Sequence, residues 1–166
     1  MSETLADDVV TRLSGAADAA SVRAALSGRA DVMEMTQATH DAALTPADPG
    51  GLPHGLRAAL AVRIARLNGD EALAAHYMQM LEDAGASVDE AAAADPGFKG
   101  SGRLGAAIAF TDLVTMRTRE TTAADIEALQ KVGIGDADIV RLAELNAFLA
   151  YQVRLIAGLK LMRATA

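Results

Sequence analysis

The chain contains no cysteine and no tryptophan, and aromatic side chains make up only 3% of its 166 residues. Without a thiol, the protein can neither form a disulfide nor use a thiolate as a nucleophile or metal ligand. Hydrophobic residues nevertheless reach 51%, so the core must be built from alanine, leucine, valine, isoleucine and methionine. Small and flexible side chains of this kind favour closely packed helices.

Clusters of basic residues and long apolar runs are also missing. The formal net charge is −7 and the sequence pI is near 4.9, so a phosphate backbone or an anionic membrane surface would repel the chain. Asp112 interrupts the best apolar stretch before it reaches the roughly 18 residues of a membrane span. The acidic start, MSETLADD, lacks the basic region of an export signal. We expect a cytoplasmic protein that binds neither nucleic acid nor membrane.

Helical periodicity runs through nearly the whole chain, and no stretch alternates in the manner of a half-buried strand. The sequence therefore predicts an all-α protein. Its length is that of one domain, which buries about two-thirds of the surface of the unfolded chain. We predict a single domain over residues 1–166, with N-terminal helices in 1–50 and a helical core in 53–166.

Caps and breaks set the expected helix boundaries. A first helix carries Leu5, Val9 and Leu13 and ends at Gly15, Ser21 caps a second helix, and a third covers Asp31 to Leu44. After a loop rich in proline and glycine come two helices that form a hairpin over His54 to Gly85. Asn68-Gly69 ends the first helix of the hairpin, and Asp70 caps the second. Ser87 and Glu90 match a capping box for a short helix that follows.

Further helices are expected from about Arg103 to Arg117, from Ala123 to Val132, and from Ala137 to about Met162, the last capped by Asp136. The final helix carries apolar residues on two faces, so both faces must be buried by neighbouring helices or by another subunit. We expect both causes together, and therefore a homo-oligomer.

The hairpin segment NGDEALAAHY resembles the alkylhydroperoxidase D and carboxymuconolactone decarboxylase superfamily. Three further stretches are similar to that family: LRAALAVRIA, TTAADIEALQKVGIGDADI and AFLAYQVRLIAGL. The resemblance implies an alkylhydroperoxidase D-like multi-helix bundle that assembles as a trimer or hexamer, with a dimer as the alternative. In the redox branch it also implies a Cys-x-x-Cys-x-x-x-His pattern and a relay glutamate on the preceding helix.

Neither alignment of that pattern supplies a sulfur. Aligning by His76 puts Gly69 and Ala72 at the cysteine positions; aligning by Asn68-Gly69 puts Asp70 and Leu73 there, with Tyr77 at the histidine. The relay glutamate would fall within Arg57–Ala59, where no acid occurs. The chain thus resembles a subgroup that lacks the cysteine pair, and thiol-based peroxide reduction is disfavoured.

Four residues are candidates for a site. His76 and Tyr77 are candidate catalytic residues, and Tyr151 and Arg154 could bind an acidic substrate. For three of them a structural alternative is favoured: His76 as a core or interface residue bonded to backbone, Tyr77 as core, and Arg154 in an ion pair with Glu144 or Glu71. Arg57 and Arg63 are expected to be solvated or paired at interfaces.

No metal site or cofactor is expected, because His40, His54 and His76 are scattered along the chain without cysteine and without helical pairing to another ligand. The glycine-rich segment 97–103 follows a helix rather than a strand, so its expected role is a flexible connector and not a phosphate loop.

Three functions follow, in descending order of preference. The first is a non-redox homologue that binds a small ligand or forms a complex, for example with a thiol-bearing homologue. The second is a cysteine-independent decarboxylase or lactone isomerase that uses His76. The third is residual peroxidase activity, implied by the resemblance alone. Whether the protein is an enzyme at all is left open by the sequence.

Overall fold

The structure is a computed structural model that describes residues 8–165. Within this range every regular element is an α-helix or a short 3-10 helix, which confirms the all-α prediction. The α-helices are α2 (Val9–Ser14), α3 (Ala20–Ser27), α4 (Ala30–Leu44), α5 (His54–Leu67), α6 (Glu71–Asp83), α7 (Val88–Ala92), α8 (Gly102–Arg117), α9 (Ala123–Lys131) and α10 (Asp136–Ala164). The 3-10 helices are η1 (Ala16–Asp18) and η2 (Thr118–Glu120). No helix in the described range combines the length and the apolar character that a bilayer crossing requires.

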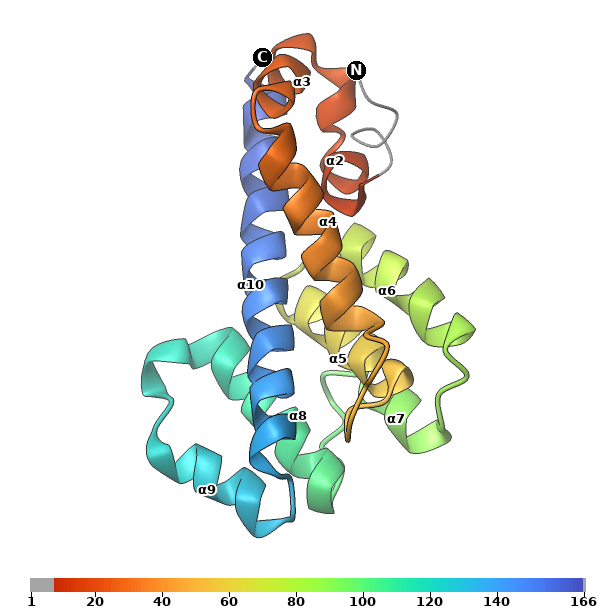
Figure 1. The fold of residues 1–166 in the computed structure, drawn as a ribbon, viewed down its shortest axis with the longest axis vertical. Helices are drawn as coiled ribbons and strands as arrows, with labels where there is room; N and C mark the ends of the chain where they lie inside the picture. Colours follow the sequence, from red (N-terminus) through yellow and green to blue (C-terminus); the bar gives the residue numbers. More distant parts are fainter. Residues whose placement is uncertain (1–7, 166) are drawn as a thin grey trace.

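Helix α10 runs along most of the length of the molecule, and α4 lies beside it (Figure 1). Helices α2 and α3 lie near its C-terminal end, and α8 and α9 lie near its N-terminal end. Helix α5 is the centre of the core, because every residue from Gly55 to Ala65 is buried. It packs against α4, α6, α7, α8 and α10. A helix that is covered on all sides in this way needs apolar or paired side chains all round.

The hairpin has the boundaries that its caps predict. Asp70 accepts a hydrogen bond from the backbone of Leu73 at 3.1 Å, and Ser87 forms the capping box with Glu90. Two predicted caps are wrong. Ser21 lies inside α3, which begins at Ala20, and Asp136 is the first residue of α10 rather than its cap. Asp136 instead places a carboxylate in the first turn, where its negative charge interacts favourably with the helix dipole. Leu5 lies outside the described residues.

Both apolar faces of α10 are largely buried within a single chain. Leu142, Leu145, Leu149 and Ile156 are among its fully buried residues, whereas Met162 is 48% exposed. Helices α2, α4, α5 and α8 provide this cover. The two-faced pattern is therefore explained without a second subunit, and the homo-oligomer stays an expectation.

The prediction for Arg57 and Arg63 is wrong, because both side chains are buried. Arg57 donates to the backbone oxygens of Ala43 and Leu52, at 2.7 and 2.8 Å. Arg63, which has no exposed surface, lies against Asp112 of α8 with two hydrogen bonds of 2.5 and 2.7 Å. Because α5 is central, its polar positions also face protein, and a guanidinium is tolerated there only when its donors are satisfied.

Arg63 also anchors the loop between α7 and α8. Its remaining donors reach backbone oxygens of Ala93, Asp95, Pro96 and Phe98. This arrangement ties the start of the glycine-rich segment to the core, so the expectation of a flexible connector is wrong at its first residues. We call Arg63, Asp112 and these four carbonyl groups the Arg63 network.

Candidate functional site

Two of the three histidines lie next to each other, although the sequence suggests that they are scattered. The rings of His40, on α4, and His76, on α6, have centroids 5.7 Å apart and planes inclined by 36°. His54 lies elsewhere and hydrogen-bonds to the backbone oxygen of Pro46. The helices that carry the pair are separated in sequence by the buried α5, so only their packing brings the two rings together.

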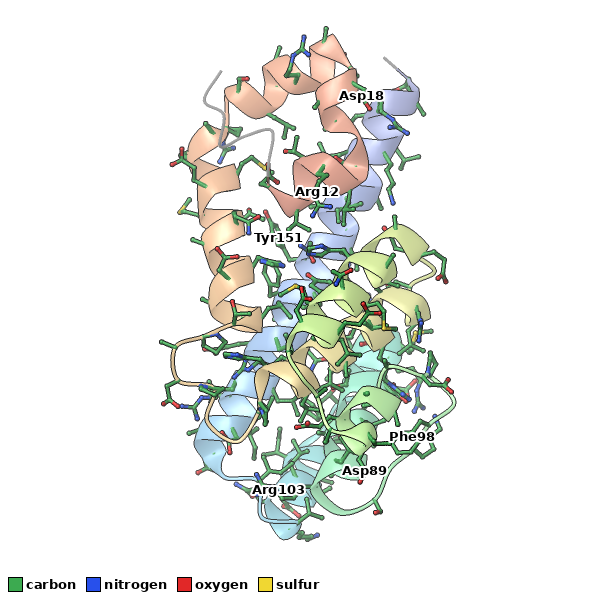
Figure 2. The ribbon with its side chains drawn as sticks, turned by 90° about the vertical axis from the view of Figure 1, so that its right-hand side faces the viewer. Arg12, Asp18, Asp89, Phe98, Arg103 and Tyr151 are labelled. Carbon is green, nitrogen blue, oxygen red and sulfur yellow. The ribbon has the colours of Figure 1, made fainter. Side chains whose placement is uncertain are left out.

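His76 is oriented by Arg12 of α2, whose Nη2 lies 3.3 Å from His76 Nδ1 (Figure 2). A guanidinium can only donate, so Nδ1 must accept, and the proton of the neutral ring is then on Nε2. Burial, followed by electrostatic repulsion from His40 and then from Arg12, lowers the pKa of His76 to about 4. At neutral pH this histidine is an uncharged ring whose Nε2–H group is available as a donor.

His40 has the opposite arrangement of its proton. Its Nδ1 lies 2.9 Å from Oδ1 of Asp41, and an ionised carboxylate can only accept. The amide nitrogen of Gln37, which can only donate, lies 3.3 Å from the same Nδ1, but the carboxylate contact is the shorter of the two. We therefore assign the proton of the neutral ring to Nδ1, which leaves Nε2 as an acceptor. Gln37 donates to the same carboxylate oxygen at 2.8 Å, which helps hold Asp41 in place. With only 5% of its surface exposed, His40 is the more deeply buried of the pair.

Tyr77 and Gln152 complete the group around the two rings. The hydroxyl of Tyr77 donates to Oε1 of Gln152 on α10, and both residues are fully buried. Burial raises the pKa of Tyr77, so its hydroxyl is neutral and is not a base. The Tyr77 ring stacks on His40 at 6.0 Å, and Phe148 meets His40 edge-on at the same distance.

We call these five residues, His40, His76, Tyr77, Phe148 and Gln152, the histidine cluster. Three of its buried nitrogen atoms have no hydrogen-bond partner within residues 8–165, namely Nε2 of His40, of His76 and of Gln152. Buried polar groups in native proteins are nearly always paired, so unpaired ones mark positions that need a physical explanation. All three atoms belong to one cluster.

The histidine cluster does not provide a metal site. Over the described part of the chain, no three histidine or acidic side chains are grouped so that they could hold an ion. A metal would also need an unprotonated Nε2 on each imidazole, whereas the contact with Arg12 keeps the proton of His76 on that atom.

A second feature is a groove of about 850 Å³ between α4 and α10, which we call the α4/α10 groove. Its lining is mostly apolar and includes Met35, Ala147 and Phe148. Tyr151, which is 41% exposed, bonds Oγ1 of Thr36 through its hydroxyl at 2.9 Å and lies between the two helices (Figure 2). Phe148 belongs to both the groove and the histidine cluster.

Arg154 is separate from this groove. Its side chain is exposed and donates to the backbone oxygen of Ala150 at 2.8 Å. Within residues 8–165 it forms no ion pair with Glu144 or Glu71, so the predicted pairing is wrong. The structure thus brings Tyr151, but not Arg154, to the groove, and the charged residue that does line it is Glu144.

The positions that the family resemblance aligns with redox residues hold side chains that cap a helix, form an ion pair or are buried in the core. Asp70 caps α6 and forms an ion pair with Lys160 at 2.9 Å, and Leu73 is fully buried. Where the family resemblance would place a relay glutamate, Arg57 binds backbone oxygens, while Ala58 and Ala59 are buried. Arg57 and Asp70 tie the hairpin to the preceding loop and to α10, and none of these side chains carries a thiol that could react with a peroxide.

Sequence reasoning missed Arg12, His40, Asp41 and Gln152. His40 lies near the end of an amphipathic helix, and its apolar surroundings could have marked it as buried. Arg12 gives no local signal, because it belongs to a six-residue helix that is distant from His76 in the sequence. Only the packing of α2 against α10 brings it to the hairpin.

Comparisons with known proteins give a structural match without a sequence match. No family model matches the chain, and no curated protein matches its sequence. The fold is similar to the crystal structure of an uncharacterized peroxidase-related protein from Silicibacter sp. TM1040, with a TM-score of 0.67 and 17% sequence identity. The match covers 78% of this chain and 68% of the other. At this identity the likeness shows a peroxidase-related helical fold, and a shared fold does not carry an activity with it.

Proposed function

We propose that this protein works without thiol redox chemistry and binds a small, mostly apolar ligand in the α4/α10 groove. The observation that carries the proposal is the groove itself, an apolar space of about 850 Å³ with a few polar groups at its edge. Pockets for small molecules in proteins commonly have volumes of about 300–1,000 Å³ and this kind of lining. As part of the proposal, the protein is a member of an alkylhydroperoxidase D-like subgroup that has the peroxidase-related fold but lacks the cysteine pair.

The lining indicates the chemistry of the ligand. Met35 and Phe148 offer flexible and aromatic contacts, and the hydroxyl groups of Thr36 and Tyr151 can bind one polar group. Glu144 adds a negative charge, and Arg154 does not line the groove. A neutral or cationic ligand is therefore favoured over the acidic substrate that the sequence suggests.

Binding can be tested with Nile red, a neutral apolar dye whose fluorescence rises in apolar surroundings. Ala147→Trp fills the groove with an indole ring, and we expect it to weaken dye binding at least tenfold. Ala157→Trp is the matched control, since Ala157 is exposed on the same helix but does not line the groove. Equal binding by both variants and the parent protein would contradict the proposal.

The non-redox part of the proposal follows from the composition. Reduction of a peroxide by this route needs one thiolate to attack oxygen and a second thiol to resolve the sulfenic acid, and the chain has no cysteine. Mixed with a hydroperoxide and a thiol reductant, the protein should consume peroxide no faster than buffer does. Turnover above that rate would support residual peroxidase activity instead.

We also propose that the chain forms a homo-oligomer, as a trimer or hexamer. Support comes from apolar side chains at the surface near the groove, above all Met35, which is 59% exposed. Light scattering of the parent protein should give a multiple of the 17.1 kDa chain mass. A monomeric parent protein would argue against assembly. If the parent is an oligomer and Ala147→Trp is a monomer, the groove binds a second copy of the chain rather than a ligand. A complex with a thiol-bearing homologue would be detected by the same measurement on a mixture.

A second candidate function is acid–base catalysis centred on His76, as in a decarboxylase or lactone isomerase. The proximity of two imidazole rings favours it. Burial of both Nε2 atoms ranks it below ligand binding. If this function is right, His76→Ala should abolish turnover of a lactone or β-keto acid while the fold is retained. An effect on stability alone would contradict a catalytic role for His76.

A further inference from the structure

We propose that the histidine cluster is a second binding site, which holds the hydroxyl group of one small neutral molecule between His40 and His76. This site is distinct from the α4/α10 groove, because neither imidazole lines the groove. Water and small alcohols such as methanol share the required group.

The two imidazole rings have complementary proton states. Arg12 directs the proton of His76 to Nε2, which makes that atom a donor. Asp41 directs the proton of His40 to Nδ1, which leaves Nε2 as an acceptor. A hydroxyl group both donates and accepts, so a single oxygen atom can bind both rings. The ring centroids are 5.7 Å apart, so the two imidazoles are neighbours, and the proposal places one oxygen within hydrogen-bond distance of both Nε2 atoms.

Gln152 supplies a third interaction. Its Oε1 accepts from Tyr77, so its Nε2 is left as a buried donor in the same cluster. An oxygen with two lone pairs can accept from His76 and Gln152 while it donates to His40. Three hydrogen bonds of this kind are typical of a molecule bound inside a protein, and they would satisfy all three unpaired nitrogen atoms.

The same proton states exclude other ligand classes. A metal ion needs a lone pair on Nε2 of both histidines, and His76 does not offer one. A carboxylate or another anion has no proton to donate to His40 Nε2. Its charge would also have to enter a cluster in which His40 and Gln152 are almost wholly buried. A neutral hydroxyl group is the class that matches every unpaired atom.

Long-range ¹H–¹⁵N NMR spectra of the parent protein at pH 7 test the proton states directly. We expect the Nε2–H tautomer for His76 and the Nδ1–H tautomer for His40. If either ring has its proton on the other nitrogen, or if both are on the same one, the proposal is overturned. This measurement requires no substitution and so does not depend on how well a variant folds.

A high-resolution crystal structure of the parent, with and without a methanol soak, tests the occupant. We expect one ordered molecule within hydrogen-bond distance of Nε2 of both histidines. Replacement by methanol supports a site for small alcohols, and retention of water alone supports a site limited to water. A direct bond between the two nitrogens, or no ordered molecule in contact with them, overturns the proposal.

His40→Phe keeps a ring of similar shape but removes the acceptor, so the bound molecule should be lost while the circular dichroism spectrum is unchanged. His54→Phe is the matched control, because His54 lies outside the cluster and bonds Pro46. We expect the bound molecule and both tautomers to be retained in the control. A molecule that stays in place in His40→Phe would overturn the assignment of His40 as its acceptor.

Discussion

The Arg63 network and the histidine cluster are both polar groups in a core made mostly of small apolar side chains, but they differ in how completely they are paired. Each of the three guanidinium nitrogens of Arg63 has at least one partner, through Asp112 and four backbone oxygens. In the histidine cluster each imidazole has one bonded nitrogen and one that is unpaired within the described range. A fully paired network stabilises one structure, whereas an incompletely paired one has capacity to bind something else.

The difference also reflects where the partners come from. Arg63 uses backbone carbonyl groups of one loop and one acid on α8, all of which are held by the fold itself. The histidines use Arg12 and Asp41, whose side chains are largely exposed to solvent. The Arg63 network therefore has a structural role, and the histidine cluster is where ligand-dependent behaviour is to be sought.

The largest expected effect is that of Arg63→Met, which leaves four backbone oxygens without their donor and Asp112 with only the exposed Lys99 as a partner. Breaking a buried ion pair by removing one member costs about 3–5 kcal/mol in the free energy of unfolding. Urea denaturation measures this loss. Lys99→Met is the control, since Lys99 lies 3.6 Å from the same carboxylate but is 72% exposed; it should cost less than about 1 kcal/mol. Equal losses of unfolding free energy in the two variants would show that the buried Arg63 stabilises the fold no more than the exposed Lys99 does.

Tyr77→Phe should have the next largest effect, because it leaves Oε1 of Gln152 buried without its donor. An unsatisfied buried acceptor costs about 1–3 kcal/mol. The matched control is Tyr151→Phe, which removes a hydroxyl that bonds Thr36 at a partly exposed position. Thermal denaturation of both variants would show a smaller change for Tyr151→Phe. A negligible effect of Tyr77→Phe would mean that Gln152 readily finds another partner.

Lowering the pH should weaken the protein through His76. The pKa of this histidine is about 4 in the folded state, against an ordinary value of 6.5 for an exposed histidine in an unfolded chain. The unfolded chain therefore takes up a proton at a higher pH than the folded one. The contribution of neutral His76 to the free energy of unfolding is fully present above pH 6.5 and is lost as the pH falls toward 4. After allowance for partial exposure, this loss is about 1–2 kcal/mol.

Urea denaturation between pH 7 and pH 4 measures this dependence, and His76→Phe should flatten it. Arg12 of α2 and His40 of α4 are the charged neighbours that lower the pKa of His76, and both remain in the His76→Phe variant. If the parent and His76→Phe lose stability in parallel over this range, other groups cause the loss.

The smallest effect is expected from Arg12→Met, which removes the hydrogen bond to Nδ1 and one positive charge. Burial is the main cause of the lowered pKa of His76, followed by the charge of His40. The pKa should therefore rise only part of the way from about 4 toward 6.5, which an NMR titration of the ring protons can follow. Arg23→Met, an exposed substitution on α3, should leave the titration unchanged. A full return of the pKa to 6.5 would show that Arg12, rather than burial, dominates.

Much of the fold could be predicted from the sequence because helix caps act over three or four residues. Asp70 and the Ser87–Glu90 pair have the predicted roles, and the faces of α6 follow from its spacing. The failures at Ser21 and Asp136 are shifts of one or two residues at helix ends, where Ala19 and Gly135 are the caps and no side chain bonds the first backbone donors.

The candidate site was less predictable. His76 and Tyr77 share a face of α6, but their partners come from other helices: Arg12 from α2, His40 from α4 and Gln152 from α10. The burial of Arg57 and Arg63 could not be predicted from composition either, since arginine is usually at the surface. It depends on α5 being covered on all sides.

What the sequence determined by itself is the all-α class, the hairpin with its caps, and the exclusion of thiol chemistry. These properties depend on local hydrogen bonding, on side-chain spacing along a helix and on the residue types present. Only the tertiary structure decided that His40 meets His76, that Arg12 and Asp41 contact one nitrogen of each ring, and that Arg63 is paired while the described part of the cluster keeps unpaired nitrogens. Those properties depend on contacts between helices that are distant in the sequence, and the packing of the whole chain is what brings them together.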